Sequence, residues 1–318
     1  MVTDPDLEKQ ELHTRFAVCL AAYNGVHFVA EQINSILEQT GVDLHLFVSV
    51  DQSTDGTESR LAQWARSEPR LTLLPFGHSF GGAAQNFFRL LRDIDLARFD
   101  YLSFSDQDDI WDPEKLLRAH SVITAEGAAG YSSNFTAFWP SGAERFINKA
   151  SPQKEWDFLF QSAGPGCTYV LHRSLALPLQ ELVRGADQSL SLIDYHDWLT
   201  YAFARWHDFH WVIDDWSSMK YRQHANNQIG VNAGWRSFWL RAQKVLSGYG
   251  FQQSLLIADV IGASSTPLVK RGLRGGRLGY LWLALRARQC RRRPVDQLWF
   301  FISCVLLAVI KPADRRSP

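Results

Sequence analysis

The first 130 residues alternate between short apolar runs and segments with helical spacing of apolar residues, and few folds accommodate that alternation. Apolar runs of strand length occupy residues 15–25, 44–51, 70–75 and 100–106. A helical pattern follows each of them. Strands and helices that alternate in this way build a mostly parallel sheet with helices on both faces. The chain has 318 residues, 46% of them hydrophobic, which is enough to bury such a sheet, so we predict an α/β fold.

Polar side chains gather where three of the predicted strands end. These clusters are the Tyr-Asn-Gly turn at 23–25 and the segments 51–56 and 106–109. In α/β sheets, ligands bind beyond the carboxyl ends of the strands, so the three clusters are the first candidates for a binding site. After Tyr131 the alternation becomes irregular.

Three aspartates, Asp106, Asp108 and Asp109, occupy four positions directly after the fourth predicted strand. In an extended segment Asp106 and Asp108 point the same way, so Mg²⁺ or Mn²⁺ can bridge them and complete its shell with substrate phosphates. The competing interpretation is a solvated loop that caps the next helix. Asp112 is the better N-cap, which leaves the other three free. Their position at a strand end therefore favours a metal–diphosphate site.

Several familiar motifs are excluded by their spacing. Residues 51–62 begin like a calcium-binding EF-hand loop, but its last position requires Glu and is Ala62. The sequence contains neither a GxxxxGK[ST] phosphate loop nor a GxSxG hydrolase elbow. Asp51, at the end of a strand, is better suited to accept hydrogen bonds from a nucleobase or a ribose.

Six blocks in a fixed order carry a family resemblance. The first three are VCLAAYNGVHFVAEQINSILEQT, VSVDQSTDGT and SDQDDIW, and the later three are GCTYVLHRSL, YHDWLTYAFA and YRQHANNQIG. Together they resemble family 2 glycosyltransferases, the inverting GT-A enzymes, and in particular their bacterial rhamnosyltransferase-like branch. The match covers residues 15–230 and implies a GT-A-like nucleotide-binding fold with a mostly parallel central sheet.

The resemblance also implies a role for each matching site residue. It implies that the donor is bound by Tyr23, Asn24, Asp51, Asp55, Asp106 and Arg222. A divalent metal is assigned to Asp108 and Asp106, with His224 as a third ligand or a diphosphate contact. Asp197 occupies the place of the catalytic base. The competing interpretation is that Asp197 caps its helix, a role that Asp194 can also fill.

The implied reaction is inverting transfer of a sugar from a nucleotide diphospho-sugar to a glycan or lipid-linked acceptor in bacterial surface polysaccharide synthesis. Rhamnose from dTDP-rhamnose is the leading donor. Two departures from the family pattern leave the nucleobase open. Gln52 stands where many members have Asp, and His78-Ser79-Phe80 stands where Asn-x-Gly is common.

Two other functions remain as alternatives. A metal-dependent nucleotidyltransferase also uses carboxylates at strand ends, but it usually needs Lys or Arg near the first loop, and AAYNGVHF has neither. A non-catalytic glycan-binding protein would have a degenerate site, whereas the aspartates and His224 are intact. Nucleic acid is not an expected partner, because no aromatic stacking platform interleaves with the arginines of the tail.

The C-terminal region differs in charge from the rest of the chain. From Thr266 onward, 12 basic residues stand against two acidic ones, a net charge of +10 in a chain that is neutral overall. We divide the chain into a GT-A domain, 1–235, and a basic, helical C-terminal tail, 236–318. The apolar run at 298–310 is shorter than the roughly 20 residues of a membrane span. Two interpretations of the tail are equally supported: helices packed on the catalytic domain with residues 291–293 solvated, or an anchor on an anionic membrane.

The expected location follows from the N-terminus and the cysteines. Residues 1–15 are polar and acidic, unlike a signal peptide, and the four cysteines are scattered as in a reducing compartment. We therefore expect a cytoplasmic protein that is peripheral on the inner face of the cytoplasmic membrane.

Overall fold

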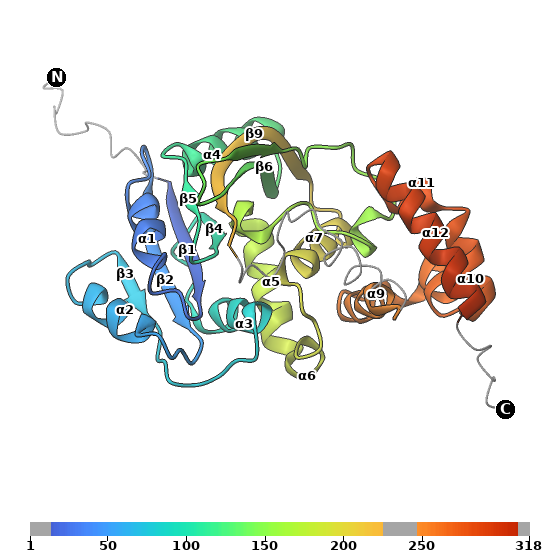
Figure 1. Ribbon diagram of the computed structural model, residues 1–318, viewed down its shortest axis with the longest axis horizontal. Helices are drawn as coiled ribbons and strands as arrows, with labels where there is room; N and C mark the ends of the chain where they lie inside the picture. Colours follow the sequence, from blue (N-terminus) through green and yellow to red (C-terminus); the bar gives the residue numbers. More distant parts are fainter. Residues whose placement is uncertain (1–13, 225–246, 311–318) are drawn as a thin grey trace, which may run out of the picture.

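The computed structural model describes residues 14–224 and 247–310, and its N-terminal half follows the predicted alternation (Figure 1). Each predicted strand and helix is present. The strands are β1 (Arg15–Ala22), β2 (Asp43–Val50), β3 (Leu71–Leu73) and β4 (Tyr101–Ser105). The helices are α1 (Val29–Leu37), α2 (Thr57–Ala65), α3 (Ala83–Asp93) and α4 (Lys115–Glu126).

The sheet joins a parallel half to a mixed half. Strands β3, β2, β1 and β4 are parallel neighbours in that order. The later strands, whose positions the sequence pattern left open, are β5 (Ile110–Trp111), β6 (Gly130–Phe138), β7 (Glu144–Ile147), β8 (Val170–His172) and β9 (Trp211–Arg222). β8 pairs antiparallel with β4 and β6, and β9 pairs parallel with β6. The predicted α/β fold is confirmed, and the ends of β1, β2 and β4 meet at one edge.

The core explains why the first strand is apolar at almost every position. Side chains of β1 alternate between two hydrophobic clusters. Ala17 and Cys19 face the cluster that contains α3, α5 (Arg173–Gly185) and α7 (His196–Trp206). Phe16 and Val18 face the cluster that contains α1, α2 and α4. Both faces of the sheet are therefore covered, as is typical of parallel sheets.

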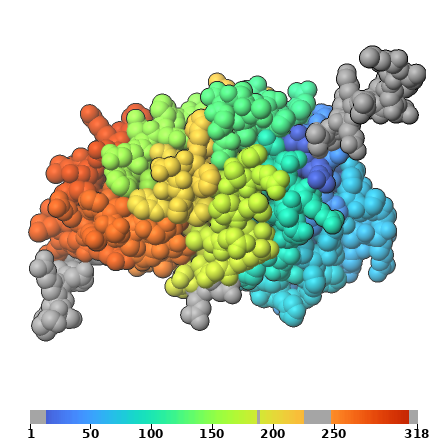
Figure 2. Space-filling view, turned by 180° about the vertical axis from the view of Figure 1, so that it is seen from behind, coloured from blue at the N-terminus to red at the C-terminus, as the bar shows by residue number. Residues whose placement is uncertain are grey.

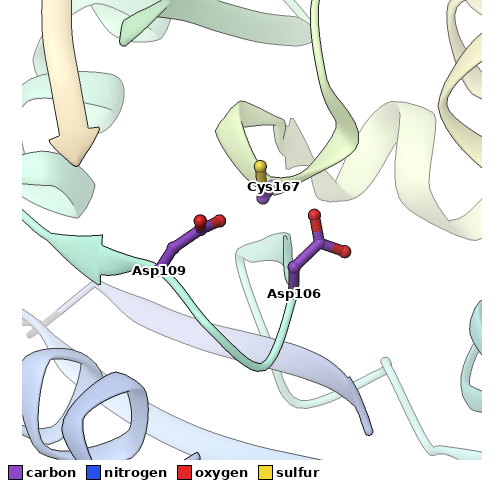
Figure 3. Close-up of side chains that lie close together, drawn as sticks. All are labelled: Asp106, Asp109 and Cys167. Carbon is purple, nitrogen blue, oxygen red and sulfur yellow. The ribbon is translucent and has the colours of Figure 1, made fainter. Parts of the chain in front are cut away.

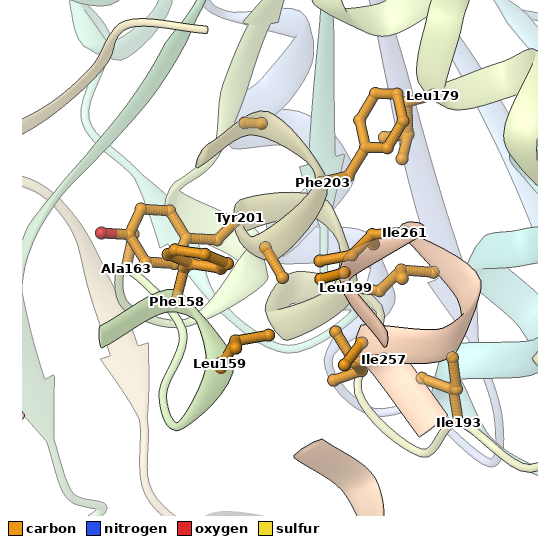
Figure 4. Close-up of a cluster of buried hydrophobic side chains, with 14 of the residues drawn as sticks. Phe158, Leu159, Ala163, Leu179, Ile193, Leu199, Tyr201, Phe203, Ile257 and Ile261 are labelled. Carbon is orange, nitrogen blue, oxygen red and sulfur yellow. The ribbon is translucent and has the colours of Figure 1, made fainter. Parts of the chain in front are cut away.

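The C-terminal tail folds against the body of the protein. Its helices are α9 (Tyr249–Val260), α10 (Gly276–Ala284), α11 (Ala287–Cys290) and α12 (Pro294–Ile310). Ile257 and Ile261 pack in one buried cluster with Leu199 of α7 (Figure 4). In the space-filling view the orange tail lies directly against the green and yellow body (Figure 2). The tail helices therefore pack on the body of the protein, as one of the two interpretations predicts.

The expectation of a solvated arginine cluster in the tail is wrong for two of its three members. Arg291 donates a hydrogen bond to the carbonyl oxygen of Phe160 over 2.7 Å. Arg292 donates to the carbonyl of Ser162 over 2.7 Å and pairs with the buried carboxylate of Asp157. The loop of residues 157–162 contains buried hydrogen bond acceptors. The two guanidinium groups are internal because they donate to these oxygens. The proposed domain boundary at 235/236 lies outside the described residues.

Within residues 14–224 and 247–310, no helix is both long and apolar enough to span a membrane. The longest candidate, α12, has 17 residues.

Candidate active site

The turn after β1 and the loop after β2 hold each other through backbone-directed hydrogen bonds. Asn24 adopts a left-handed conformation with φ of 45°, and its Oδ1 accepts from the Thr54 amide at 2.8 Å. Asp55 accepts from the amides of Val26 and Thr57 at 3.0 Å each. Burial alone would raise the pKa of Asp55, but the hydrogen bonds from Thr57 and Val26 lower it. Asn24 and Asp55 therefore shape the site, and both oxygens of Asp55 are already engaged.

Tyr23 and Asp51, the predicted base and ribose contacts, differ in their exposure. Tyr23, directly after β1, is 57% exposed. Asp51 is buried, and its Oδ1 accepts from the amides of Gln52 and Phe80 at 2.9 and 2.8 Å. Asp51 thus anchors the segment 78–80, where the sequence departs from the family pattern. Within the described residues no hydrogen bond ends on its Oδ2, which is available to a ribose or a base.

Gln107, which the sequence pattern did not single out, joins the acidic loop to the first turn. Its side chain accepts from the Tyr23 amide and donates to the Tyr23 carbonyl, each over 2.8 Å. A Cβ at Gly25 would lie 2.1 Å from Gln107 Oε1, so a larger residue there would displace the Gln107 side chain. Gln107 lies between Asp106 and Asp108. A single amide in a loop matches no motif from which its contacts could be predicted.

The acidic loop bends, contrary to the extended geometry expected from the sequence. Bends at 107 and 108 turn Asp106 and Asp109 toward each other below Cys167 (Figure 3). One ligand atom from each of these three residues lies within 4.8 Å of the others. Asp108 takes a different neighbour, with its Oδ2 2.6 Å from Nε2 of His224. The loop therefore presents carboxylates in two directions.

A bound positive charge would stabilise the ionised carboxyl groups of this cluster. Burial, and then the charge of Asp108, raise the pKa of Asp106 to about 7. Burial likewise raises the pKa of Asp109 well above its usual value, and its buried Oδ2 has no hydrogen bond partner among the described residues. Burial also raises the pKa of the Cys167 thiol, which therefore stays protonated and is a poor ligand. Carboxylate oxygens are the donors that Mg²⁺ and Mn²⁺ prefer, so the cluster fits such a cation.

A buried amine lies beside this cluster. Lys115 is fully buried, lies 3.3 Å from the centre of the Trp111 ring and donates to the carbonyl of Cys167. Burial lowers the pKa of Lys115 to about 7, so it carries only a partial charge near neutral pH. The sequence pattern gave no reason to select it, because the first turn of a helix is usually solvated.

The predicted helix cap at Asp112 is also corrected. The helix begins at Lys115 with Glu114 in the N-cap position. Asp112 Oδ1 instead accepts from the Glu114 amide at 3.0 Å, in a turn just before the helix.

Arg222, the last residue of β9, and His224 just beyond it both contact the acidic loop. The Arg222 side chain donates to the Asp108 carbonyl at 2.8 Å and pairs with Glu31. Its backbone amide donates to Asp109 Oδ1 at 3.2 Å. His224 stacks on the Phe28 ring with centroids 4.9 Å apart. In this arrangement Arg222 braces the loop, and His224 is held beside Asp108. The rest of that sequence block, residues 225–230, lies outside the described residues.

Asp197 lies in the first turn of α7, buried and apart from the acidic loop. Its Oδ1 accepts from the Trp198 amide at 2.8 Å, and burial raises its pKa to about 6. The N-cap position of α7 is Tyr195, without a side-chain cap. Asp194, the predicted alternative cap, accepts instead from the Tyr249 hydroxyl of α9. Neither aspartate caps the helix, so the competing interpretation of Asp197 finds no support in this geometry.

A short 3₁₀ turn, η2 (Gly166–Thr168), connects Asp197 to the acidic cluster. Cys167 faces Asp106 and Asp109, while Gly166 lies against α7. A Cβ at Gly166 would come within 2.3 Å of His196 Nε2 and 3.2 Å of Asp197 Cβ. His196 is itself fixed by stacking on Phe87 with centroids 3.9 Å apart. The turn therefore holds the buried carboxylate close to the acidic cluster but separate from it.

Comparison with known proteins gives a consistent set of relatives. Residues 17–169 match the description Glycosyl transferase family 2. The dTDP-rhamnosyl transferase RfbG of Shigella flexneri is 37% identical over 90% of this chain and 99% of its own length. The Escherichia coli protein WfgD, a UDP-Glc:alpha-D-GlcNAc-diphosphoundecaprenol beta-1,3-glucosyltransferase, is 26% identical over 51% of this chain and 62% of its own.

Two solved structures share the fold. S. aureus TarS 1-349 in complex with UDP-GlcNAc is 14% identical, with a TM-score of 0.50 over 93% of this chain and 90% of its own. The mannosyltransferase PcManGT from Pyrobaculum calidifontis, in complex with GDP-Man and Mn²⁺, is 16% identical, with a TM-score of 0.50 over 94% and 86%. At these identities the likeness concerns the fold alone, which is of the GT-A type.

Proposed function

The chain belongs to glycosyl transferase family 2 and is a glycosyltransferase, and we propose that it moves a sugar with inversion from a nucleotide diphospho-sugar to a glycan or lipid-linked acceptor. The observation that carries this proposal is Asp197, a buried carboxylate with a pKa of about 6 that is separate from the acidic cluster. A base of that pKa is ionised at neutral pH and still accepts a proton. Bacterial surface polysaccharide synthesis is the process in which such transfer is expected.

The proposed reaction is a single displacement at the anomeric carbon. As Asp197 accepts the proton of the attacking acceptor hydroxyl, a bond forms between the acceptor oxygen and the anomeric carbon. The bond from that carbon to the diphosphate oxygen breaks, and the diphosphate leaves with the electron pair. Attack from the face opposite the leaving group inverts the configuration, and one base suffices because no covalent sugar–enzyme intermediate forms.

Donor binding is assigned to the edge of the sheet. The exposed Tyr23 ring can stack on the nucleobase, and Asp51 can accept from the base or the ribose. Asn24 and Asp55 keep the two loops in register through their backbone contacts. Arg222 supports the acidic loop from behind, which makes it a positioning residue for the donor.

A divalent cation, Mg²⁺ or Mn²⁺, is the proposed cofactor. Asp106 and Asp108 are the proposed ligands, with His224 held beside Asp108 as the third. Asp109 lies beside Asp106, and its buried Oδ2, which has no hydrogen bond partner among the described residues, could supply a further oxygen. When bound, the cation would neutralise the charge that develops on the leaving diphosphate, a contribution of several kcal/mol.

The proposed donor is dTDP-rhamnose, because a relative that matches along nearly its whole length is a dTDP-rhamnosyl transferase. The test is a panel of dTDP-rhamnose, UDP-glucose, UDP-GlcNAc and GDP-mannose, with and without Mn²⁺. We expect only dTDP-rhamnose with Mn²⁺ to raise the melting temperature strongly and to be hydrolysed slowly. At a ligand concentration of 100 Kd the gain in unfolding free energy is about 2.7 kcal/mol. An equal response to all four donors would contradict the assignment, and pyrophosphate release from a nucleoside triphosphate would favour a nucleotidyltransferase.

The tail carries an exposed apolar face. We define this face by the exposed apolar residues of α10, of the position just after α10 and of α12. They are Leu278, Leu281, Leu285, Val295, Leu298, Trp299, Phe301, Leu306, Val309 and Ile310. The same part of the chain carries exposed basic side chains, namely Lys270, Arg271, Arg277, Arg288 and Arg293. An apolar helix face bordered by basic residues is the pattern of an interfacial membrane contact. We propose that this face rests on an anionic membrane at the cytoplasmic side, where a lipid-linked acceptor would be found.

Two glutamate variants test the membrane contact. Leu285 is 81% exposed on the apolar face, and Phe146 on β7 is 54% exposed elsewhere. Leu285→Glu should lower partitioning onto anionic vesicles several-fold, whereas Phe146→Glu should not change it. Added salt should release the wild-type protein, because each basic residue near the surface contributes about 1 kcal/mol. Equal partitioning of wild type and Leu285→Glu onto neutral and anionic vesicles would contradict the contact.

A further inference from the structure

The ring of Phe28, directly before α1, contacts both residues that reach the acidic loop from the end of β9. Its centroid lies 4.9 Å from that of the His224 imidazole, and the two ring planes differ by 19°, so the rings are stacked. The guanidinium carbon of Arg222 lies 5.2 Å from the same centroid. The first and the last of the six sequence blocks therefore meet at a side chain that the family resemblance does not assign to the site.

The stack occupies the face of the imidazole and not its edge. A histidine binds a metal ion through a ring nitrogen, and the lone pair of that nitrogen lies in the plane of the ring. Nε2 of His224 lies 2.6 Å from Oδ2 of Asp108, the neighbouring proposed ligand. Stacking on Phe28 therefore fixes the plane in which Nε2 points toward Asp108, and it is compatible with metal binding at that edge.

The backbone at Phe28 is fixed by the turn that follows β1. The amides of Phe28 and Val29 both donate to the Gly25 carbonyl over 2.9 Å. At the other end of the same turn, the Gln107 side chain joins Tyr23 to the acidic loop. The segment 23–28 thus connects the proposed nucleoside contacts to the proposed metal ligands, and Phe28 is its contact on the metal side.

His224 gains most from such a support because of its place in the chain. β9 ends at Arg222, so sheet pairing does not extend to His224. A ligand that is already oriented binds more tightly than one that must be ordered at the moment of binding. The ring of Phe28 supplies an orienting contact from an element about 200 residues earlier in the sequence.

We propose that Phe28 is a positioning residue of the metal site, which holds the His224 imidazole with its edge toward Asp108. The inference rests on the proposed function in one respect, the role of Asp108 and His224 as ligands of a divalent cation. It goes beyond that function by assigning the orientation of the third ligand to the first sequence block. The competing interpretation is that Phe28 supports only the turn 23–25, and the two differ in their dependence on the metal.

The test compares the affinity for dTDP in Mn²⁺ with that in EDTA, because the ratio of the two isolates the contribution of the metal. Phe28→Leu keeps an apolar side chain but loses the ring, and it should lower this ratio about 2- to 12-fold, the range for one aromatic pair. The affinity in EDTA should not change. Phe28→Tyr should keep the wild-type ratio, because its ring can stack in the same way. Phe146→Leu, the same substitution on β7, is the matched control and should behave as the wild type.

A double-mutant cycle with His224→Ala shows whether Phe28 acts through the imidazole. His224→Ala should lower the ratio at least as much as Phe28→Leu does, and adding Phe28→Leu to it should lower the ratio no further. An additive loss in the double variant would overturn the inference, because Phe28 would then act by another route. Melting temperatures without ligand establish that each variant is folded, and Phe28→Met replaces Phe28→Leu in the cycle if the latter is not.

Three further outcomes separate the inference from the proposed function. A wild-type ratio in Phe28→Leu, together with a lowered ratio in His224→Ala, would overturn the inference and leave the metal site intact. A wild-type ratio in His224→Ala would overturn both, since His224 would not be a ligand. An equal loss of dTDP affinity in Mn²⁺ and in EDTA would overturn the inference alone and would assign Phe28 to the support of the nucleoside turn.

Discussion

Asp197→Asn should lower sugar transfer by roughly 10²-fold or more, the usual scale for the loss of a positioned base. Asparagine keeps the shape of the side chain, and its Oδ1 can still accept from the Trp198 amide. It cannot take a proton from the acceptor. Nucleotide and metal affinities should stay at the wild-type level, because those contacts belong to Asp51, Asp106 and Asp108. Initial rates with saturating donor and acceptor, together with nucleotide titrations, measure both effects.

The pH dependence of transfer gives a second signature of the same residue. Burial raises the pKa of Asp197 from 3.8 to about 6, and a base acts only when ionised. Wild-type transfer should therefore rise with pH through about 6 and level off above it, and this limb should be missing in Asp197→Asn. If the variant turned over like the wild type, the base would lie elsewhere, and Asp194 would be the next residue to replace.

The stability of the folded protein serves as the control. Its dependence on pH follows from the direction in which folding shifts the pKa of Asp197. A carboxyl whose pKa is higher in the folded than in the unfolded state favours folding only while protonated. That contribution is complete below the unfolded value near 3.8 and is lost as the pH rises through about 6. Asn removes the buried charge, so Asp197→Asn should melt no lower than the wild type at pH 7–8. A large loss of stability there would mean that Asp197 has a structural role instead.

Asp108→Asn should abolish the Mn²⁺-dependent part of nucleoside diphosphate affinity. A bound cation contributes several kcal/mol of charge neutralisation, so we expect a loss of roughly 10²-fold or more in the presence of Mn²⁺. The fold should persist, because Asp108 lies in a loop and its carbonyl contact with Arg222 is unaffected. Calorimetric titration with dTDP, with and without Mn²⁺, measures the effect.

Asp112→Asn is the matched control for the metal site. Asp112 lies four residues further along, and its side chain accepts from the Glu114 amide, a contact that asparagine can also make. Its Mn²⁺-dependent affinity should equal that of the wild type. An unchanged Mn²⁺ dependence in Asp108→Asn would exclude Asp108 as a ligand and favour Asp106 and Asp109, whose ligand atoms lie within 4.8 Å of each other.

The sequence by itself determined the half of the fold that is built from local alternation. Apolar runs such as β1 are apolar at nearly every position because both of their faces are buried, and this pattern is readable without any knowledge of distant partners. Helical spacing between the runs then fixes a parallel sheet. Because strand ends of a parallel sheet share an edge, the site clusters at 23–25, 51–56 and 106–109 were also predictable. The family blocks added the prediction that Asp197 is the base.

Only the tertiary structure decided which side chains meet. Lys115 and Gln107 reach the site through contacts with backbone groups 52 and 84 residues away, and no periodicity records such pairs. The bend after β4 turned Asp109 toward Asp106, where an extended segment would have paired Asp106 with Asp108. Arg291 and Arg292 became internal because the loop 157–162 offers them buried acceptors. Asp197 lines a cavity whose other walls come from α9 and α12. Packing between segments so far apart in the sequence depends on the shapes of their side chains. A linear pattern of apolar and polar residues does not encode those shapes.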